Sequence, residues 1–150
     1  MDRHYSKVHQ LWKSIHRATA SKIAGEKIRL HELVHMMFDD ATGVTQDDAE
    51  VWIAEGIAVL YAKQTDLRYV SEINYPKLVE LIGFDNFVDE GGFDYAGIYV
   101  WYFVKKYGFA KFLEVYREEC EWQGMIYDGF EKEAIQNYLR YVPYLIPPQS

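Results

Sequence analysis

The residues best suited to chemistry are the two histidines of the pentapeptide HELVH at positions 31–35. If this segment is helical, His31 and His35 stand four residues apart, and both imidazoles project from one face about one turn apart. Two imidazole nitrogens at this spacing suit Zn²⁺, which prefers histidine nitrogen and carboxylate oxygen in a tetrahedral shell. Glu32 points to the side, where it can reach a water on the metal. This is the arrangement of a general base in a zinc hydrolase.

A third ligand is predicted at Glu55, the only charged residue of the apolar segment 51–62. A helix that is apolar all round is buried, and a buried carboxylate is costly unless it is paired or bound to a metal. His31, His35 and Glu55 therefore form a predicted site for one zinc ion per chain, with a fourth position open. Two alternatives remain: the short motif arises by chance, or Asp47, which lies in a polar run, is the third ligand.

The other histidines are His4, His9 and His16, all in the first 18 residues. Apolar residues at helical spacing predict an amphipathic helix over residues 4–18. The three histidines fall on its Lys- and Arg-rich polar side. They could in principle bind a metal, but we interpret them as surface residues.

The order of residues around Glu55 resembles a known family. HExxH is followed, after residues 36–51, by the segment WIAEGIA at 52–58, which has the form WxxEGxA, and residues 36–54 separate His35 from Glu55. This pattern is similar to that of the gluzincins, zinc peptidases whose third ligand is a glutamate on the next helix, and in particular to the peptidase MA-like group. The metzincin alternative would need a histidine where Ala41 stands, and no histidine follows His35. The resemblance implies a zinc peptidase.

A looser part of the resemblance lies in residues 94–108, DYAGIYVWYFVKKYG, which look like the family helix Y-x-x-G-x-x-V-x-x-L-x-x-x-Y-G. In the aminopeptidase branch, a tyrosine of this region hydrogen-bonds the tetrahedral intermediate. The resemblance implies that role for Tyr95, although it stands two residues before Gly97 where the family has three. Tyr99, one turn later on the same face, is the second candidate. A phenol donor can stabilise a developing oxyanion by a few kcal/mol; the alternative is that both tyrosines are core residues.

Length and periodicity predict a mainly α protein with little or no β-sheet. The 150 residues suffice for a single domain with its own core, and we expect that domain to span residues 1–150. The resemblance implies a zincin-like (gluzincin) fold, which usually places a small sheet before the metal helix. Here only 23 residues precede that helix, and their sequence predicts a helix instead of a sheet. The expected helices occupy residues 4–18, 24–38, 47–63, 75–82, 93–107, 109–121 and 131–141, with a loop at 65–73 and a turn at 89–92.

Net charge and hydropathy argue against some classes of binding partner. The net charge of −7 with no basic patch argues against nucleic-acid binding. The chain has no run of about 18 apolar residues and no signal-peptide pattern, and it has a single cysteine, Cys120. We therefore expect a soluble, cytoplasmic protein without a membrane partner, with a fragment of a longer protein as the alternative.

Two functions are predicted from these observations. The first is a zinc metallopeptidase that hydrolyses peptide or protein substrates, with Glu32 as general base. The second is a zincin-like binding or regulatory module with weak or no catalysis. The sequence does not indicate peptide specificity or oligomeric state.

Overall fold

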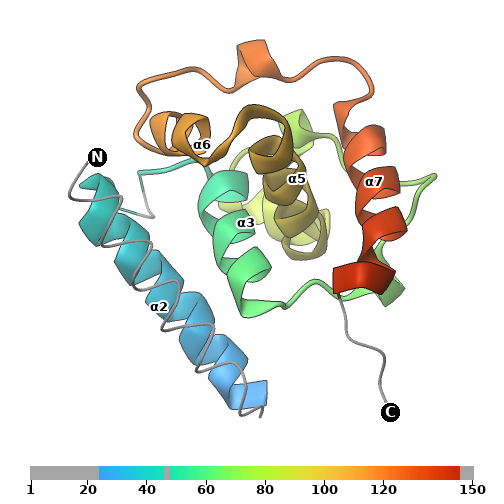
Figure 1. Cartoon of the computed structure of the whole chain (residues 1–150), viewed down its shortest axis with the longest axis horizontal. Coiled ribbons are helices and arrows are strands. Elements are labelled where there is room, and N and C mark those ends of the chain that lie inside the picture. The colour runs from blue at the N-terminus through green and yellow to red at the C-terminus, as the bar shows by residue number, and fades with distance from the viewer. Residues whose placement is uncertain (1–23, 46–47, 146–150) are drawn as a thin grey trace.

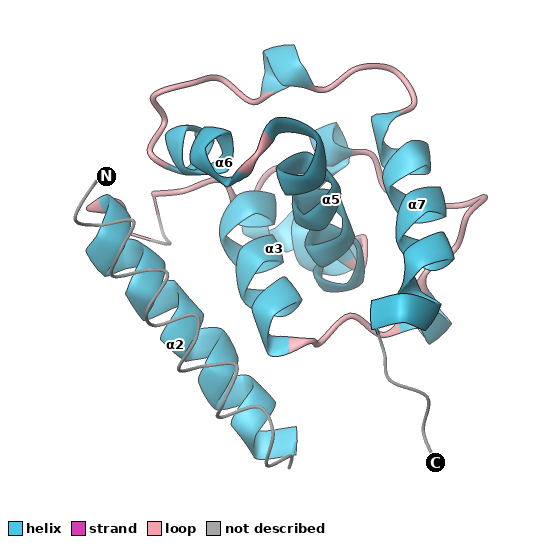
Figure 2. Ribbon diagram, viewed as in Figure 1, coloured by secondary structure: helices cyan, strands magenta, loops and turns pink. Residues whose placement is uncertain are grey.

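The computed structural model describes residues 24–45 and 48–145 (Figure 1). These residues form helices and loops and contain no strand, which confirms the mainly α class (Figure 2). The segment expected as a helix at 4–18 lies outside the described residues, as do Asp47 and the three N-terminal histidines. The helices are α2 (Ala24–Thr42), α3 (Val51–Ala62), α4 (Phe84–Asp89), α5 (Gly92–Tyr107), α6 (Phe109–Tyr116) and α7 (Phe130–Leu145), with short 3-10 helices η1 (Leu67–Tyr69), η2 (Leu78–Leu81) and η3 (Gln123–Met125).

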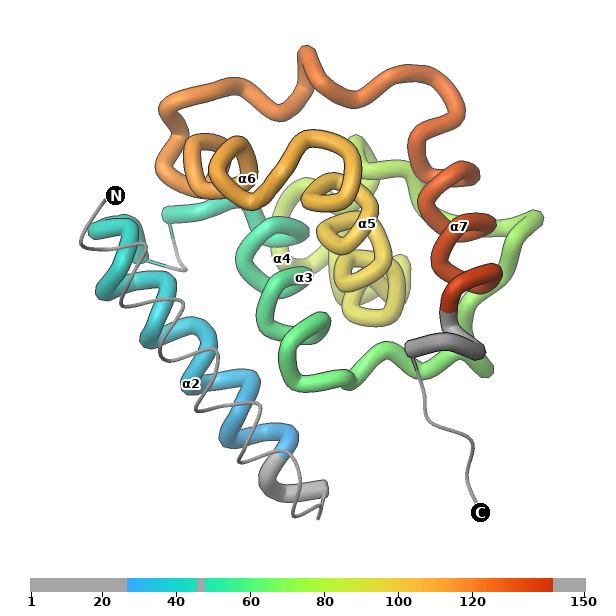
Figure 3. The backbone as a smooth tube through the Cα atoms, in the orientation of Figure 1, coloured from blue at the N-terminus to red at the C-terminus, as the bar shows by residue number. Residues whose placement is uncertain are grey.

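Helices α3 and α5 form the centre of the described structure. Helix α2 lies along α3, and α7 packs against the other side of α5 (Figure 3). The central pair is unusually close because α3 has a glycine at the crossing. A Cβ on Gly56 would lie 2.6 Å from the carbonyl oxygen of Ala96 and 2.5 Å from a methyl carbon of Val100. Only glycine allows this approach. The contact fixes α3 against α5, and it therefore sets the position of the neighbouring Glu55.

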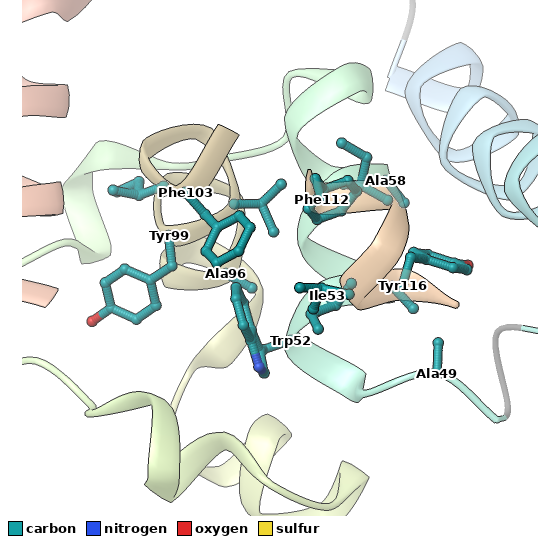
Figure 4. Close-up of a cluster of buried hydrophobic side chains, with 14 of the residues drawn as sticks. Ala49, Trp52, Ile53, Ala58, Ala96, Tyr99, Phe103, Phe112 and Tyr116 are labelled. Atoms are coloured by element: carbon teal, nitrogen blue, oxygen red, sulfur yellow. The ribbon is translucent and has the colours of Figure 1, made fainter. Parts of the chain in front are cut away.

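The core is built largely from aromatic side chains on several helices (Figure 4). Trp52 of α3 contacts Phe103 of α5 edge-on, with ring centroids 6.3 Å apart. Phe38, near the end of α2, packs against Tyr116 of α6 at 5.3 Å. Eight of the twelve residues of α3 are buried, as its apolar sequence predicted. In the described part of the chain, no helix is long and apolar enough to cross a membrane.

Several helix boundaries differ from the expected ones. Helix α2 continues to Thr42, and the helix expected at 75–82 is reduced to η2. A short helix, α4, precedes the predicted turn at 89–92 and begins after Gly83, whose φ of 84° is in the left-handed region. Helix α6 ends at Tyr116, earlier than expected, and Glu118 follows with φ 61°. These turns depend on left-handed backbone angles, which residue type alone did not indicate at Glu118.

Candidate metal centre

The predicted ligands meet where α2 lies along α3. His31 and His35 are one turn apart on α2, and Glu55 stands in the middle of α3. Their side chains are 12%, 3% and 17% exposed, so the group is largely shielded from water but not sealed. The burial follows from sequence, because each ligand sits among apolar neighbours that turn its helix face towards the core.

The donor atoms converge on one another. Nε2 of His31 lies 2.8 Å from Oε2 of Glu55 and 3.0 Å from Nε2 of His35. Nε2 of His35 lies 3.3 Å from Oε1 of Glu55. One ligand atom from each residue falls within 4.8 Å of the others, so the group could hold a metal ion.

Electrostatics keep Glu55 ionised in this arrangement. Burial alone would raise the pKa of Glu55, but hydrogen bonds from His31 and His35 outweigh it and lower the pKa to about 2. Burial would lower the pKa of His31, but hydrogen bonds to Glu55 and Gln64 outweigh it and raise that pKa. The lowered pKa favours the negative form of the Glu55 carboxylate, and the raised pKa of His31 favours the positive imidazolium beside it.

Gln64 is a member of the site that sequence reasoning missed. Its Oε1 lies 2.6 Å from Nδ1 of His31, on the side of the ring opposite Glu55. It stands just beyond the end of α3, where nothing in the sequence distinguishes it from an ordinary polar loop residue. The second histidine differs: Nδ1 of His35 is buried, and among the described residues it has no hydrogen-bond partner.

The site opens into a cavity of about 680 Å³. The carboxyl group of Glu32 lines this cavity, and its charge contributes to the raised pKa of His31. Glu32 is thus exposed and lines the same cavity as His31, His35 and Glu55. The apolar side chains that line the cavity come from α2, α3, α4 and α5, and they are Ile28, Val51, Ala54, Val59, Phe84 and Phe93.

The two candidate tyrosines lie away from this cavity. The hydroxyl of Tyr99 donates to the carbonyl oxygen of Pro76 at 2.6 Å, and in Figure 4 it points away from α3. The hydroxyl of Tyr95 accepts from the N–H of Ser71 at 2.9 Å, and the side chain lines a different cavity. The rotation of α5 about its axis explains this placement. Ala96 and the residue one turn later face α3, and therefore Tyr95 and Tyr99 are turned towards the loop before α4. The structure does not bring either phenol to the metal centre.

We compared the chain with protein-family models, with curated proteins and with solved structures, and none of the three comparisons gave a match.

Proposed function

We propose that this protein is a zinc-dependent peptidase of the gluzincin type, with a zincin-like helical fold. The observation that carries the proposal is the convergence of His31, His35 and Glu55 from two helices, with Glu32 beside them in an open cavity. The resemblance of HExxH and WxxEGxA to the gluzincin pattern supports the reaction class. Hydrolysis of a peptide bond, as opposed to another bond, rests on that resemblance.

The donor set fits zinc. Two imidazoles and one carboxylate are common protein ligands of catalytic zinc, which keeps its fourth position for water or substrate. Bonds of about 2.0–2.1 Å in a tetrahedral shell hold ligand atoms about 3.3 Å apart. The 2.8 Å contact of His31 Nε2 and the 3.3 Å contact of His35 Nε2 involve different carboxylate oxygens of Glu55, and the two Nε2 atoms lie 3.0 Å apart. With one ligand atom from each residue, the three atoms lie within 4.8 Å of one another, so modest side-chain adjustments would bring them to this spacing.

The chain's own residues supply binding and proton transfer. His31, His35 and Glu55 would hold the ion, and zinc in such a site supplies a Lewis acid that polarises a carbonyl and makes water more acidic. Glu32, with its carboxylate exposed in the cavity, would take a proton from the water that attacks the peptide carbonyl. It would then return this proton to the nitrogen of the leaving amine.

The proposal is tested by locating the metal and removing the base. Anomalous scattering at the zinc edge should place one ion on His31, His35 and Glu55. Glu32→Gln should keep the zinc and the fold but lose hydrolysis of an unfolded protein substrate, because the amide keeps the size of the side chain and cannot accept the proton. The matched control is Glu72→Gln, an exposed carboxylate in a loop, which should retain activity.

Two results would overturn the assignment. Zinc found on His4, His9 or His16 would move the metal site, and near wild-type activity of Glu32→Gln would remove the base.

The second candidate is a binding or regulatory module that keeps zinc without catalysis. It is favoured by the placement of Tyr95 and Tyr99, since neither phenol is at the cavity to stabilise an oxyanion. Zinc bound at the predicted ligands, with no cleavage of any unfolded substrate by the wild-type protein, would establish this function instead.

A further inference from the structure

The hydrogen bond between Gln64 and His31 joins a loop residue to the proposed ligand set. A histidine that binds metal through Nε2 must carry its proton on Nδ1, and a hydrogen-bond acceptor at Nδ1 selects that tautomer. Oε1 of Gln64 is such an acceptor, at 2.6 Å from Nδ1. The opposite ring nitrogen, Nε2, is the one that faces Glu55 and His35.

The backbone holds Gln64 in place for this contact. Lys63, the residue before it, has φ 55° and ψ 46°, a left-handed conformation that reverses the chain at the end of α3. The N–H of Gln64 then donates to the carbonyl oxygen of Val59 at 3.0 Å. Lys27 of α2 reaches the carbonyl oxygen of Lys63 with its Nζ at 3.3 Å, so α2 contacts the same turn. A non-glycine residue rarely adopts this backbone conformation, and here it directs the next side chain to a ligand.

The structure assigns Gln64 as the positioning residue of the metal centre: its amide oxygen orients the His31 ring and presents Nε2 to the ion. This inference rests on the proposed zinc site and adds to it the residue that controls one ligand. Gln64 acts through His31 and is not itself one of the proposed ligands.

The choice of an amide has a chemical consequence. His31 already has Glu55 at 2.8 Å, and Glu32 is near enough to influence its pKa. A neutral acceptor orients the ring without adding a third negative charge, which would make the imidazole more electron-donating and weaken the ion as a Lewis acid. By contrast, Nδ1 of His35 has no partner among the described residues, so that ring is held by its burial and by the contacts of its Nε2.

Two variants of similar length separate hydrogen bonding from packing. Gln64→Met keeps the reach of the side chain but has only a weak acceptor, whereas Gln64→Glu keeps a strong one. We expect Gln64→Met to weaken zinc binding about 10–100-fold, the usual effect of losing such a partner. Gln64→Glu should bind zinc at least as tightly as wild type. Gln136→Met, an exposed glutamine on α7, is the matched control and should have wild-type affinity.

Zinc affinity is measured by competition with a chelator, and the His31 tautomer by ¹⁵N NMR of the zinc-loaded protein. Wild type and Gln64→Glu should show a protected Nδ1–H signal from His31, and Gln64→Met should lose it. Melting curves of the metal-free variants show whether each one folds, and if Gln64→Met does not, the NMR signal in wild type decides alone. A protected Nδ1–H in wild type supports the inference, and its absence overturns it.

The two proposals fail in different ways. If wild type binds no zinc at His31, His35 and Glu55, the proposed function fails. If wild type binds zinc there, and Gln64→Met binds it equally tightly with the same Nδ1–H signal, only the role of Gln64 is wrong.

Discussion

The candidate metal centre between α2 and α3 and the face of α5 that carries Tyr95 and Tyr99 both bury polar side chains, but the hydrogen-bond partners of these side chains differ. At the metal centre, His31, His35 and Glu55 are each other's partners, and their donor atoms point to one place. On α5, the hydroxyls of Tyr95 and Tyr99 are hydrogen-bonded to backbone groups of the loop before α4. The side chains of the first group have ligand atoms that a metal ion could use. The hydroxyls of the second group are bonded to the backbone, and they hold a loop in place.

Removal of the Glu55 carboxylate should have the largest effect of all the changes considered, and this effect should be on the candidate metal centre. Glu55→Ala should lose at least about 100-fold in zinc affinity, since even residues that only orient a ligand are worth about 10–100-fold. Zinc at 100 times its dissociation constant adds about 2.7 kcal/mol to the stability of the native state. This corresponds to roughly 5–10 °C in the melting temperature of a domain of this size, and Glu55→Ala should lose that gain.

Four melting curves test this prediction: wild type and Glu55→Ala, each with and without zinc. Metal-free Glu55→Ala need not be less stable than metal-free wild type, because the substitution removes a buried charge. A variant that gains as much from zinc as wild type would exclude Glu55 from the site and direct attention to Asp47.

A smaller effect on stability is expected at the two tyrosines of α5. Tyr99→Phe leaves the carbonyl oxygen of Pro76 without its buried donor, which should cost about 1–2 kcal/mol. The melting temperature should fall by roughly 3–6 °C, with no change in zinc affinity. Tyr95→Phe is the companion variant: it removes the acceptor of the Ser71 N–H at 2.9 Å and two longer contacts to carbonyl oxygens at 3.3 and 3.4 Å, so a loss of similar size is expected. If either variant weakened zinc binding, the hydroxyl would have to reach the metal centre.

A further expected effect is a pH dependence of the metal-free protein. The pKa of Glu55 is lowered from 4.5 to about 2, because hydrogen bonds from His31 and His35 outweigh the burial that raises it. Its contribution to stability is therefore present above 4.5 and lost as the pH falls towards 2. The pKa of His31 is raised from 6.5, where hydrogen bonds to Glu55 and Gln64 outweigh burial, so its contribution is present below 6.5 and lost as the pH rises.

The pair thus stabilises the metal-free protein most between pH 4.5 and 6.5. Denaturant unfolding of wild type and Glu55→Gln, both free of metal, should show the largest difference in that window. A difference that stays constant across the whole pH range would mean that the two groups do not interact as the distances indicate.

The sequence predicted the grouping of His31, His35 and Glu55 better than it predicted the surroundings of that group. The i, i+4 spacing of His31 and His35 follows from helix geometry, and Glu55 was identified because it is the one charge in an apolar helix. Both signals are local. The partner of His31 was not predictable, because Gln64 reaches it through a left-handed turn that the sequence does not mark.

The positions of the two tyrosines show the same limit of prediction from sequence. Tyr95 and Tyr99 share a helix face, as expected, but which way that face turns depends on the contact of Gly56 with Ala96. This is a packing property of two helices more than 30 residues apart in sequence, and no local pattern encodes it. The existence of α5 as a helix was predictable from the sequence, and the rotation of α5 about its axis was not.

Helix α2 is held to the rest of the described protein by unlike contacts along its length. Near its C-terminal end, Phe38 contacts the aromatic rings of Phe109, Phe112 and Tyr116 on α6. Towards its N-terminal end, polar contacts run through His31 to Glu55 and Gln64, and Leu30 is the buried apolar residue beside them. A chelator would therefore act on one half of a single helix. The half near His31 could open locally and exchange its amide hydrogens, while the half near Phe38 stays anchored as a pivot.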